Sequence, residues 1–263
     1  MEKYILMKNI LLLPSKMIIK VSTIITIFIA LLINRHRLLF LQYLMAFIHE
    51  ISHCIGAIIF KININSITFL PFGFYADLDN LYDVKWYKEF IIVILGPLSF
   101  FVSYFLLKYL YINNYISFLL YSEASKTNLF ILIFNLLPIY PLDGYRIIKI
   151  IFGFFFSEKR VLKSTNIISL ITTVFLLIYS FNNKQIFVIS FLIVNQYMLF
   201  RSFKVIYRRF LVSKTIENAD SRIKIHNLED LYRPFNNYII KNKKIYNEKE
   251  FSLILLNSNK KNG

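Results

Sequence analysis

Acidic residues, cysteine, glycine and proline are all scarce in this chain of 263 residues. The single cysteine, Cys54, excludes an internal disulfide, and we interpret it as a packing residue. Glycine and proline occur six times each, so the places where they cluster are informative. Only 15 acidic residues stand against 31 basic ones, which gives a formal net charge of +16.

The excess of basic over acidic residues limits the classes of partner that the chain could bind. No recognisable nucleic-acid-binding module accompanies it, so we expect no nucleic acid partner. A basic face on the cytoplasmic side would attract the anionic head groups of a lipid bilayer. The high content of Lys, Asn, Ile, Tyr and Phe, as an AT-rich genome encodes, accounts for the charge equally well.

Apolar residues are abundant, at 57% of the chain with 27 Phe and a mean hydropathy of +0.54. This composition excludes an ordinary soluble domain. It predicts an all-α polytopic membrane protein with about six transmembrane helices, because runs long enough to cross the bilayer recur. The first run lacks a cleavage site, so we expect it to be retained. The predicted spans are residues 17–34, 38–60, 88–111, 127–156, 163–181 and 185–201, with the shorter run 115–121 expected in a loop.

The basic residues test this arrangement, because Lys and Arg gather on the cytoplasmic side. Six spans place both termini, with most of the basic residues, on one side. The sequence therefore predicts that both termini are cytoplasmic. The opposite side receives only Arg35, Arg37, Lys108, Lys126 and Lys184.

A metal-binding pattern lies inside the second predicted span, where residues 49–53 read His-Glu-Ile-Ser-His. On a helix, His49 and His53 share one face and can bind one zinc ion, and Glu50 can act as general base towards water. Ionisable residues at membrane depth are rare and functional. The pattern therefore indicates metal-assisted hydrolysis within the bilayer.

Two histidines need a third protein ligand, with the fourth position open for water. Glu50 and Asp143 are the only acidic residues well inside the predicted spans, and Glu89 lies at the edge of one. The other histidines, His36 and His226, fall in a loop and in the tail. Asp143 is therefore the candidate third ligand.

Pro138, Pro141 and Gly144 interrupt the fourth span around Asp143. Broken helices at membrane depth are tolerated where the backbone lines a cavity or is buried in protein. A turn with a solvated Asp at the end of a span is the alternative. The second and fourth spans run in the same direction, so we expect Asp143 within ligand reach of the histidines.

Residues 62–73, between the second and third spans, alternate apolar and polar side chains at first and end in Pro71 and Gly73. This pattern predicts a short strand or β-hairpin. An amphipathic connector at the membrane interface is the alternative. If the group hydrolysed is a peptide bond of a membrane helix, the helix hides that bond from attack. Pairing of the substrate with such a strand, in an extended conformation, would expose it.

Together these motifs, within residues 40–150, resemble the site-2 proteases, a family of multi-span zinc metalloproteases. The short form is similar to the sporulation branch. The resemblance implies that His49, His53 and Asp143 bind one Zn²⁺ ion and that Glu50 is the catalytic base. It also implies that Asn135 contacts the substrate backbone or stabilises the oxyanion. The matching segments are His49–His53, Pro71-Phe72-Gly73, Gly96-Pro97-Leu98, Asn135–Pro138 and Leu142-Asp143-Gly144.

The resemblance also implies partners. The expected substrate is a membrane-tethered protein, such as a sigma-factor precursor, cut near the cytoplasmic side; an anti-sigma factor or signal-peptide remnants are alternatives. Membrane inhibitor proteins are expected regulators. A non-enzymatic metal carrier or scaffold is the competing class, although a carrier would show polar residues along a path through several spans.

Two features depart from the family pattern. Phe74 follows Gly73 where the family often has a second glycine. The second departure is the short tail, since the sporulation branch usually ends in a nucleotide-sensing module like those of cystathionine-β-synthase (CBS). We place the membrane domain at residues 1–201 and a basic cytoplasmic tail at 202–263. The tail has room only for a truncated or degenerate CBS-like module, so we do not assign ATP sensing to it.

Overall fold

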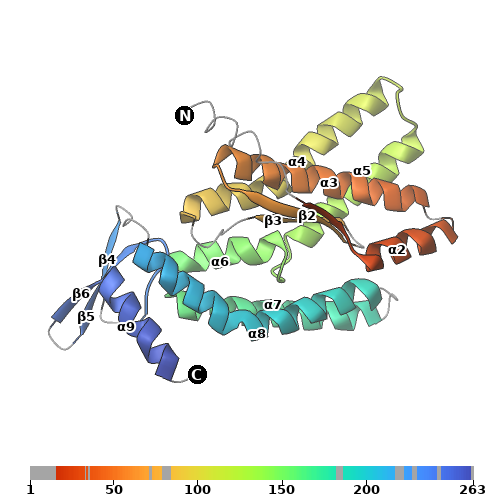
Figure 1. Cartoon of the computed structure of the whole chain (residues 1–263). Helices are drawn as coiled ribbons and strands as arrows, with labels where there is room; N and C mark the ends of the chain where they lie inside the picture. Colours follow the sequence, from red (N-terminus) through yellow and green to blue (C-terminus); the bar gives the residue numbers. More distant parts are fainter. Residues whose placement is uncertain are drawn as a thin grey trace. The chain divides into compact units, whose positions relative to one another are not determined.

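The computed structural model describes residues 16–32, 34, 36–70, 73–78, 84–181, 186–216, 222–226, 230–241 and 244–261 (Figure 1). The chain divides into two compact units, and each is described by itself. The first comprises Met1–Asp79 and Phe90–Leu136, and the second comprises Asn80–Glu89 and Leu137–Gly263.

A three-stranded sheet lies in the first unit (Figure 1). Strands β2 (Ile64–Leu70) and β3 (Gly73–Leu78) form an antiparallel hairpin, and β1 (Lys16–Ile19) pairs in parallel with β2. The hairpin predicted from the alternating sequence is confirmed over these strands. Pro71 and Phe72, at its turn, lie outside the described residues.

The first predicted span, 17–34, is wrong as a single helix. Its first residues form β1, and α2 (Val21–Leu32) has only 12 residues. The hydroxyl of Thr23 donates to the carbonyl of Phe69, which ties the start of α2 to β2. A helix of this length rises about 18 Å, well short of about 30 Å of hydrocarbon. The sequence did not predict β1 because pairing with β2 is a tertiary contact.

Three long helices complete the first unit: α3 (His36–Ile59), α4 (Trp86–Ile112), whose first residues belong to the second unit, and α5 (Phe118–Asn135). Ser117 caps α5 by accepting a hydrogen bond from the Leu120 amide, so residues 118–121 begin a helix instead of lying in a loop. An apolar core joins the three helices. It consists of Leu41, Met45, Ala46, Leu107, Ala124 and Ile131.

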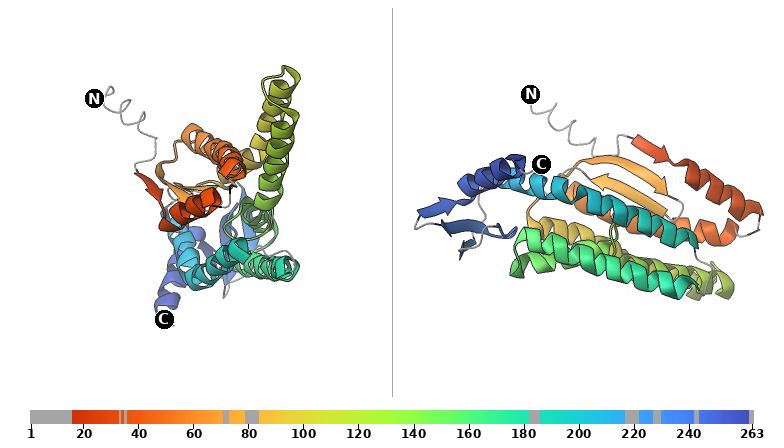
Figure 2. Two further views of the ribbon diagram at one scale, coloured as in Figure 1. Left: turned by 90° about the vertical axis from the view of Figure 1, so that its right-hand side faces the viewer. Right: turned by 90° about the horizontal axis from the view of Figure 1, so that it is seen from below.

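In the second unit, α6 (Asp143–Phe155) follows the interrupted segment, and α7 (Glu158–Phe181) packs along α8 (Ile186–Ile216). Strands β4 (Ile223–His226), β5 (Asn236–Lys241) and β6 (Lys244–Asn247) form a second sheet, followed by α9 (Glu248–Lys261). Helix α9 packs on the C-terminal part of α8 (Figure 2). The predicted domain boundary at 201/202 falls inside α8, which continues to Ile216.

Within the described residues, three helices are long and apolar enough to cross a membrane: His36–Ile59, Trp86–Ile112 and Glu158–Ile178. Many large apolar side chains on them are exposed, among them Phe105 at 63% and Phe175 at 68%. Such surfaces need an apolar surrounding. The chain is therefore a mainly helical membrane protein, not an all-α one, with two small sheets.

Candidate metal centre

Helix α3 presents the two histidines of the motif one turn apart on a buried face. Only 6% of His49 and 7% of His53 is exposed. Their Nε2 atoms lie 3.2 Å apart, and their rings meet edge to face at 85°. Two nitrogens that share one tetrahedral zinc at about 2.0–2.1 Å lie roughly 3.3 Å apart. The spacing of the pair therefore fits a common metal ion.

The second ring nitrogen of His53 has a partner of its own. Nδ1 lies 2.8 Å from the carbonyl oxygen of Ile92 on α4. A carbonyl only accepts, so Nδ1 carries the proton and Nε2 keeps its lone pair. Metal-binding histidines are commonly fixed in this way through their other nitrogen. The tautomer of His53 is therefore the one that a metal requires.

Gly96 on α4 leaves the space that the imidazoles occupy. A Cβ at this position would overlap Nε2 and Cε1 of His53 and would lie 2.8 Å from Cε1 of His49. A second glycine, Gly56 on α3, brings the helices together, since a Cβ there would lie 2.7 Å from Cδ1 of Leu95. Small residues at both points allow α4 to pack closely against the histidine face of α3.

Glu50 points from α3 to the hairpin. Its Oε1 atom accepts a hydrogen bond of 2.6 Å from the backbone amide of Ala76 on β3. Because this amide donates to α3, it points away from β2, at the outer edge of the sheet. A charge-assisted bond of this kind fixes the direction of the carboxylate. The base predicted from the sequence is thus held beside an edge strand.

Asp143 is the first residue of α6, in the second unit, and only 8% of it is exposed. A carboxylate in the first turn of a helix is stabilised by the helix dipole. The preceding segment turns tightly, as the Leu142 amide donates to the carbonyl of Ile139 at 2.7 Å. The interruption predicted from its prolines is therefore confirmed, and Asp143 is buried instead of solvated.

The other candidates have local roles in the structure. Asn135 ends α5, and its side-chain amide donates to the carbonyl of Ile131 at 3.0 Å. Glu89 forms a buried ion pair with Arg233 at 2.6 Å. Cys54 is buried and has no disulfide partner, which agrees with packing. His226 lies 3.1 Å from Oδ1 of Asn237 in the tail.

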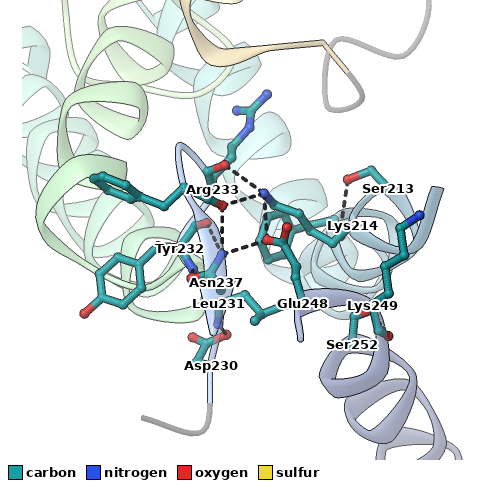
Figure 3. A network of polar contacts seen from close by, with 12 residues as sticks. Ser213, Lys214, Asp230, Leu231, Tyr232, Arg233, Asn237, Glu248, Lys249 and Ser252 are labelled. Carbon is teal, nitrogen blue, oxygen red and sulfur yellow. Dashed lines mark hydrogen bonds and ion pairs between the residues drawn. The ribbon is translucent and has the colours of Figure 1, made fainter. Parts of the chain in front are cut away.

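The tail contains a buried polar network centred on Asn237 (Figure 3). Its side-chain amide donates to the carbonyls of Tyr232 and Phe235 and to Oε1 of Glu248. Glu248 also pairs with Lys214 of α8 at 2.9 Å. These contacts join β5, α9 and α8 within the second unit.

Sequence reasoning missed several groups that contact predicted site residues or the segment that leads to Asp143. Ile92 and Ala76 act through backbone atoms, which leave no side-chain signal in a sequence. Ser169 and Gln196 are buried polar residues on α7 and α8. Their polar side chains inside predicted spans are a signal that could have identified them.

No protein-family profile matches this chain. Stage IV sporulation protein FB of Bacillus subtilis (strain 168) is 30% identical to it over 129 residues, which cover 48% of this chain and 43% of that relative. The chain thus spans less than half the length of this curated relative.

The site-2 protease from Methanocaldococcus jannaschii is similar in structure, with a TM-score of 0.55 and 24% identity, over 69% of this chain and 89% of that one. The similarity in fold covers 89% of the solved structure, whereas the curated relative matches 48% of this chain. The resemblance to the site-2 proteases that the sequence motifs predicted is therefore confirmed.

Proposed function

We propose that this protein is an intramembrane zinc metalloprotease. The observation that carries the proposal is the buried His49/His53 pair, with converging Nε2 atoms, on a helix apolar enough to cross a membrane. Burying two imidazoles in such a helix is costly unless they bind something. The sequence and fold similarities to site-2 proteases point to the same chemistry.

The proposed zinc ligands are His49, His53 and Asp143. All three side chains are buried, and each offers one nitrogen or oxygen to a metal. Two imidazoles and one carboxylate are a common ligand set of catalytic zinc, with the fourth position open. When bound, zinc would polarise a water molecule and lower its pKa towards 7.

Glu50 is the proposed general base. Its carboxylate takes a proton from water as the water oxygen bonds to the carbonyl carbon of the scissile peptide. The C–N bond then breaks, and Glu50 returns the proton to the leaving nitrogen. The products are a new carboxyl terminus and a new amino terminus. The hydrogen bond from Ala76 supports this role because it orients Glu50 before the reaction.

We further propose that the substrate is presented as an extended segment along β3. The outward Ala76 amide identifies β3 as the edge strand beside Glu50. Pairing with an edge strand uses main-chain hydrogen bonds and exposes a peptide bond. Asn135 is retained as a candidate contact for the substrate backbone.

The proposed substrate is a membrane-tethered protein cut near the cytoplasmic side. A sigma-factor precursor, which the resemblance to the sporulation branch suggests, is the first candidate. Membrane inhibitor proteins remain expected regulators. A non-enzymatic metal-binding or scaffold protein is the alternative, and the oriented Glu50 argues against it because metal binding alone does not need a base.

The test is co-expression of the chain with candidate membrane-tethered precursors, followed by detection of a cleavage product and of bound zinc. Glu50→Gln should abolish cleavage but retain zinc, since it removes the base and no ligand. His49→Ala and Asp143→Ala should lose both. Near-normal turnover of Glu50→Gln would refute the general-base role, and full zinc content in His49→Ala would refute the metal site.

A further inference from the structure

Five polar side chains in α7 and α8 are almost completely buried although these helices are largely apolar. Polar groups that are buried in a membrane helix need hydrogen-bond partners, and such residues commonly join helices. The five have at most 4% of their surface exposed. They are Thr165, Asn166, Ser169, Thr173 and Gln196.

Ser169 is bonded to the segment that leads to Asp143. Its hydroxyl oxygen accepts a hydrogen bond of 2.9 Å from the backbone amide of Tyr140. The side-chain amide of Gln196 also donates to this oxygen, from α8. Tyr140 lies between Pro138 and Pro141, where helical hydrogen bonding is interrupted, so Ser169 gives its amide a fixed partner.

A second anchor lies on the other side of Asp143. The hydroxyl of Tyr145 donates to Oδ1 of Asn166 at 2.8 Å. The rings of Tyr140 and Tyr145 also meet edge to face, with centroids 5.5 Å apart. Asn166 and Ser169 are three residues apart on α7 and therefore share one face of that helix.

Asp143 thus lies between two points that are fixed to the same helix face. The first is three residues before it and the second is two residues after it. A metal ligand must be held within a few tenths of an ångström of its ideal position. The turn that carries Asp143 has no continuous helix to supply this precision.

We propose that Ser169, Gln196 and Asn166 are positioning residues that hold Asp143 for metal binding. This inference rests on the proposed role of Asp143 as a ligand. Partners behind a metal ligand commonly contribute 10–100-fold to metal affinity or activity. If the polar cluster only satisfied buried groups, its loss would lower stability and leave metal affinity unchanged.

The experiment measures the zinc affinity of the purified full-length chain by competition with a chelator, together with cleavage as a function of zinc concentration. Ser169→Ala should weaken zinc binding by about 10–100-fold. Excess zinc should restore cleavage, and Ser169→Thr, which keeps the hydroxyl, should bind zinc like the unchanged protein. Thr172→Val is the matched control, because the Thr172 hydroxyl donates to Ile168 of its own helix.

A double-mutant cycle separates this inference from the proposed function. If Ser169 acts through Asp143, Ser169→Ala should add no further loss of zinc affinity to Asp143→Asn. Additive losses, or unchanged affinity in Ser169→Ala, would overturn the positioning role. Unchanged affinity in Asp143→Asn would instead refute the ligand. If Ser169→Ala does not fold, Tyr145→Phe tests the second anchor, with the same outcomes.

Discussion

The histidine pair depends on neighbours that have no chemical function of their own. The carbonyl of Ile92 holds the proton of His53, and the missing side chain of Gly96 leaves room for both rings. Both groups belong to one turn of α4. His49 and His53 can therefore adopt this arrangement only because α4 approaches α3 closely at this turn.

Gly96→Ala should abolish zinc binding, since the added methyl group would overlap the ring of His53. Alanine is favoured over glycine in a helix by about 1 kcal/mol, so any loss of binding has a steric cause. The measurement is zinc content after purification.

Gly153→Ala on α6 is the control for this substitution, because its Cβ would meet only Pro234 at an ordinary 3.9 Å. It should keep full zinc content and equal or higher stability. Normal zinc content in Gly96→Ala would show that the rings can move aside, and the close packing of α4 would then be irrelevant to the site.

At the scale of the elements, hydrogen bonds connect the tail to helices α7 and α8 of the second unit. The first amides of α7 donate to the carbonyl of Leu231 and to the Asp230 carboxylate, which caps that helix from the tail. Asp230 also accepts a hydrogen bond from Tyr207 of α8 at 2.7 Å. Burial, followed by the charge of Asp230, raises the pKa of Tyr207, so its phenol remains a donor.

Arg233 also connects the tail to the start of α4, through its ion pair with Glu89. Arg233→Ala should destabilise the protein by about 3–5 kcal/mol, because it leaves a buried carboxylate without its charge partner. The double substitution Glu89→Leu/Arg233→Met should recover much of this loss. Thermal unfolding in detergent measures both effects.

Arg209→Ala removes the same charge from an exposed position on α8 and serves as the control. It should change stability by less than about 0.5 kcal/mol. An equal loss in Arg209→Ala and Arg233→Ala would mean that net charge, and not the buried pair, determines stability.

For the molecule as a whole, the distribution of basic residues predicts its orientation in the membrane. The described helices α3, α4 and α7 are able to cross a bilayer, and the excess of Lys and Arg in the tail predicts that the C-terminus is cytoplasmic. The same prediction for the N-terminus required a first span, which α2 is too short to form. The corner between α4 and α5 lies at Asn114, which adopts a left-handed conformation at φ 60°.

A reporter fused after Gly263 should therefore be active only in a cytoplasmic form, and one inserted at Asn113 should report the opposite side. The measurement is paired cytoplasmic and extracytoplasmic reporter activity at each position. A cytoplasmic signal at Asn113 would contradict the predicted direction of the second span and, with it, the expectation that the second and fourth spans run in the same direction.

The sequence by itself determined the features that depend on local periodicity. The i, i+4 spacing places His49 and His53 on one helix face, alternation produces the β2–β3 hairpin, and prolines interrupt the chain before Asp143. Each follows from side chains that are close in sequence, so local rules are sufficient.

Only the tertiary structure decided which groups from distant elements complete these features. The carbonyl of Ile92, the amide of Ala76 and the hydroxyl of Ser169 come from other elements. The same cause explains two helix and strand boundaries that the sequence did not predict. Residues 16–19 form a strand because β2 offers an unpaired edge, and α8 continues past 201 because the tail packs against it. Backbone hydrogen bonding and packing between remote segments leave no periodic pattern in the sequence.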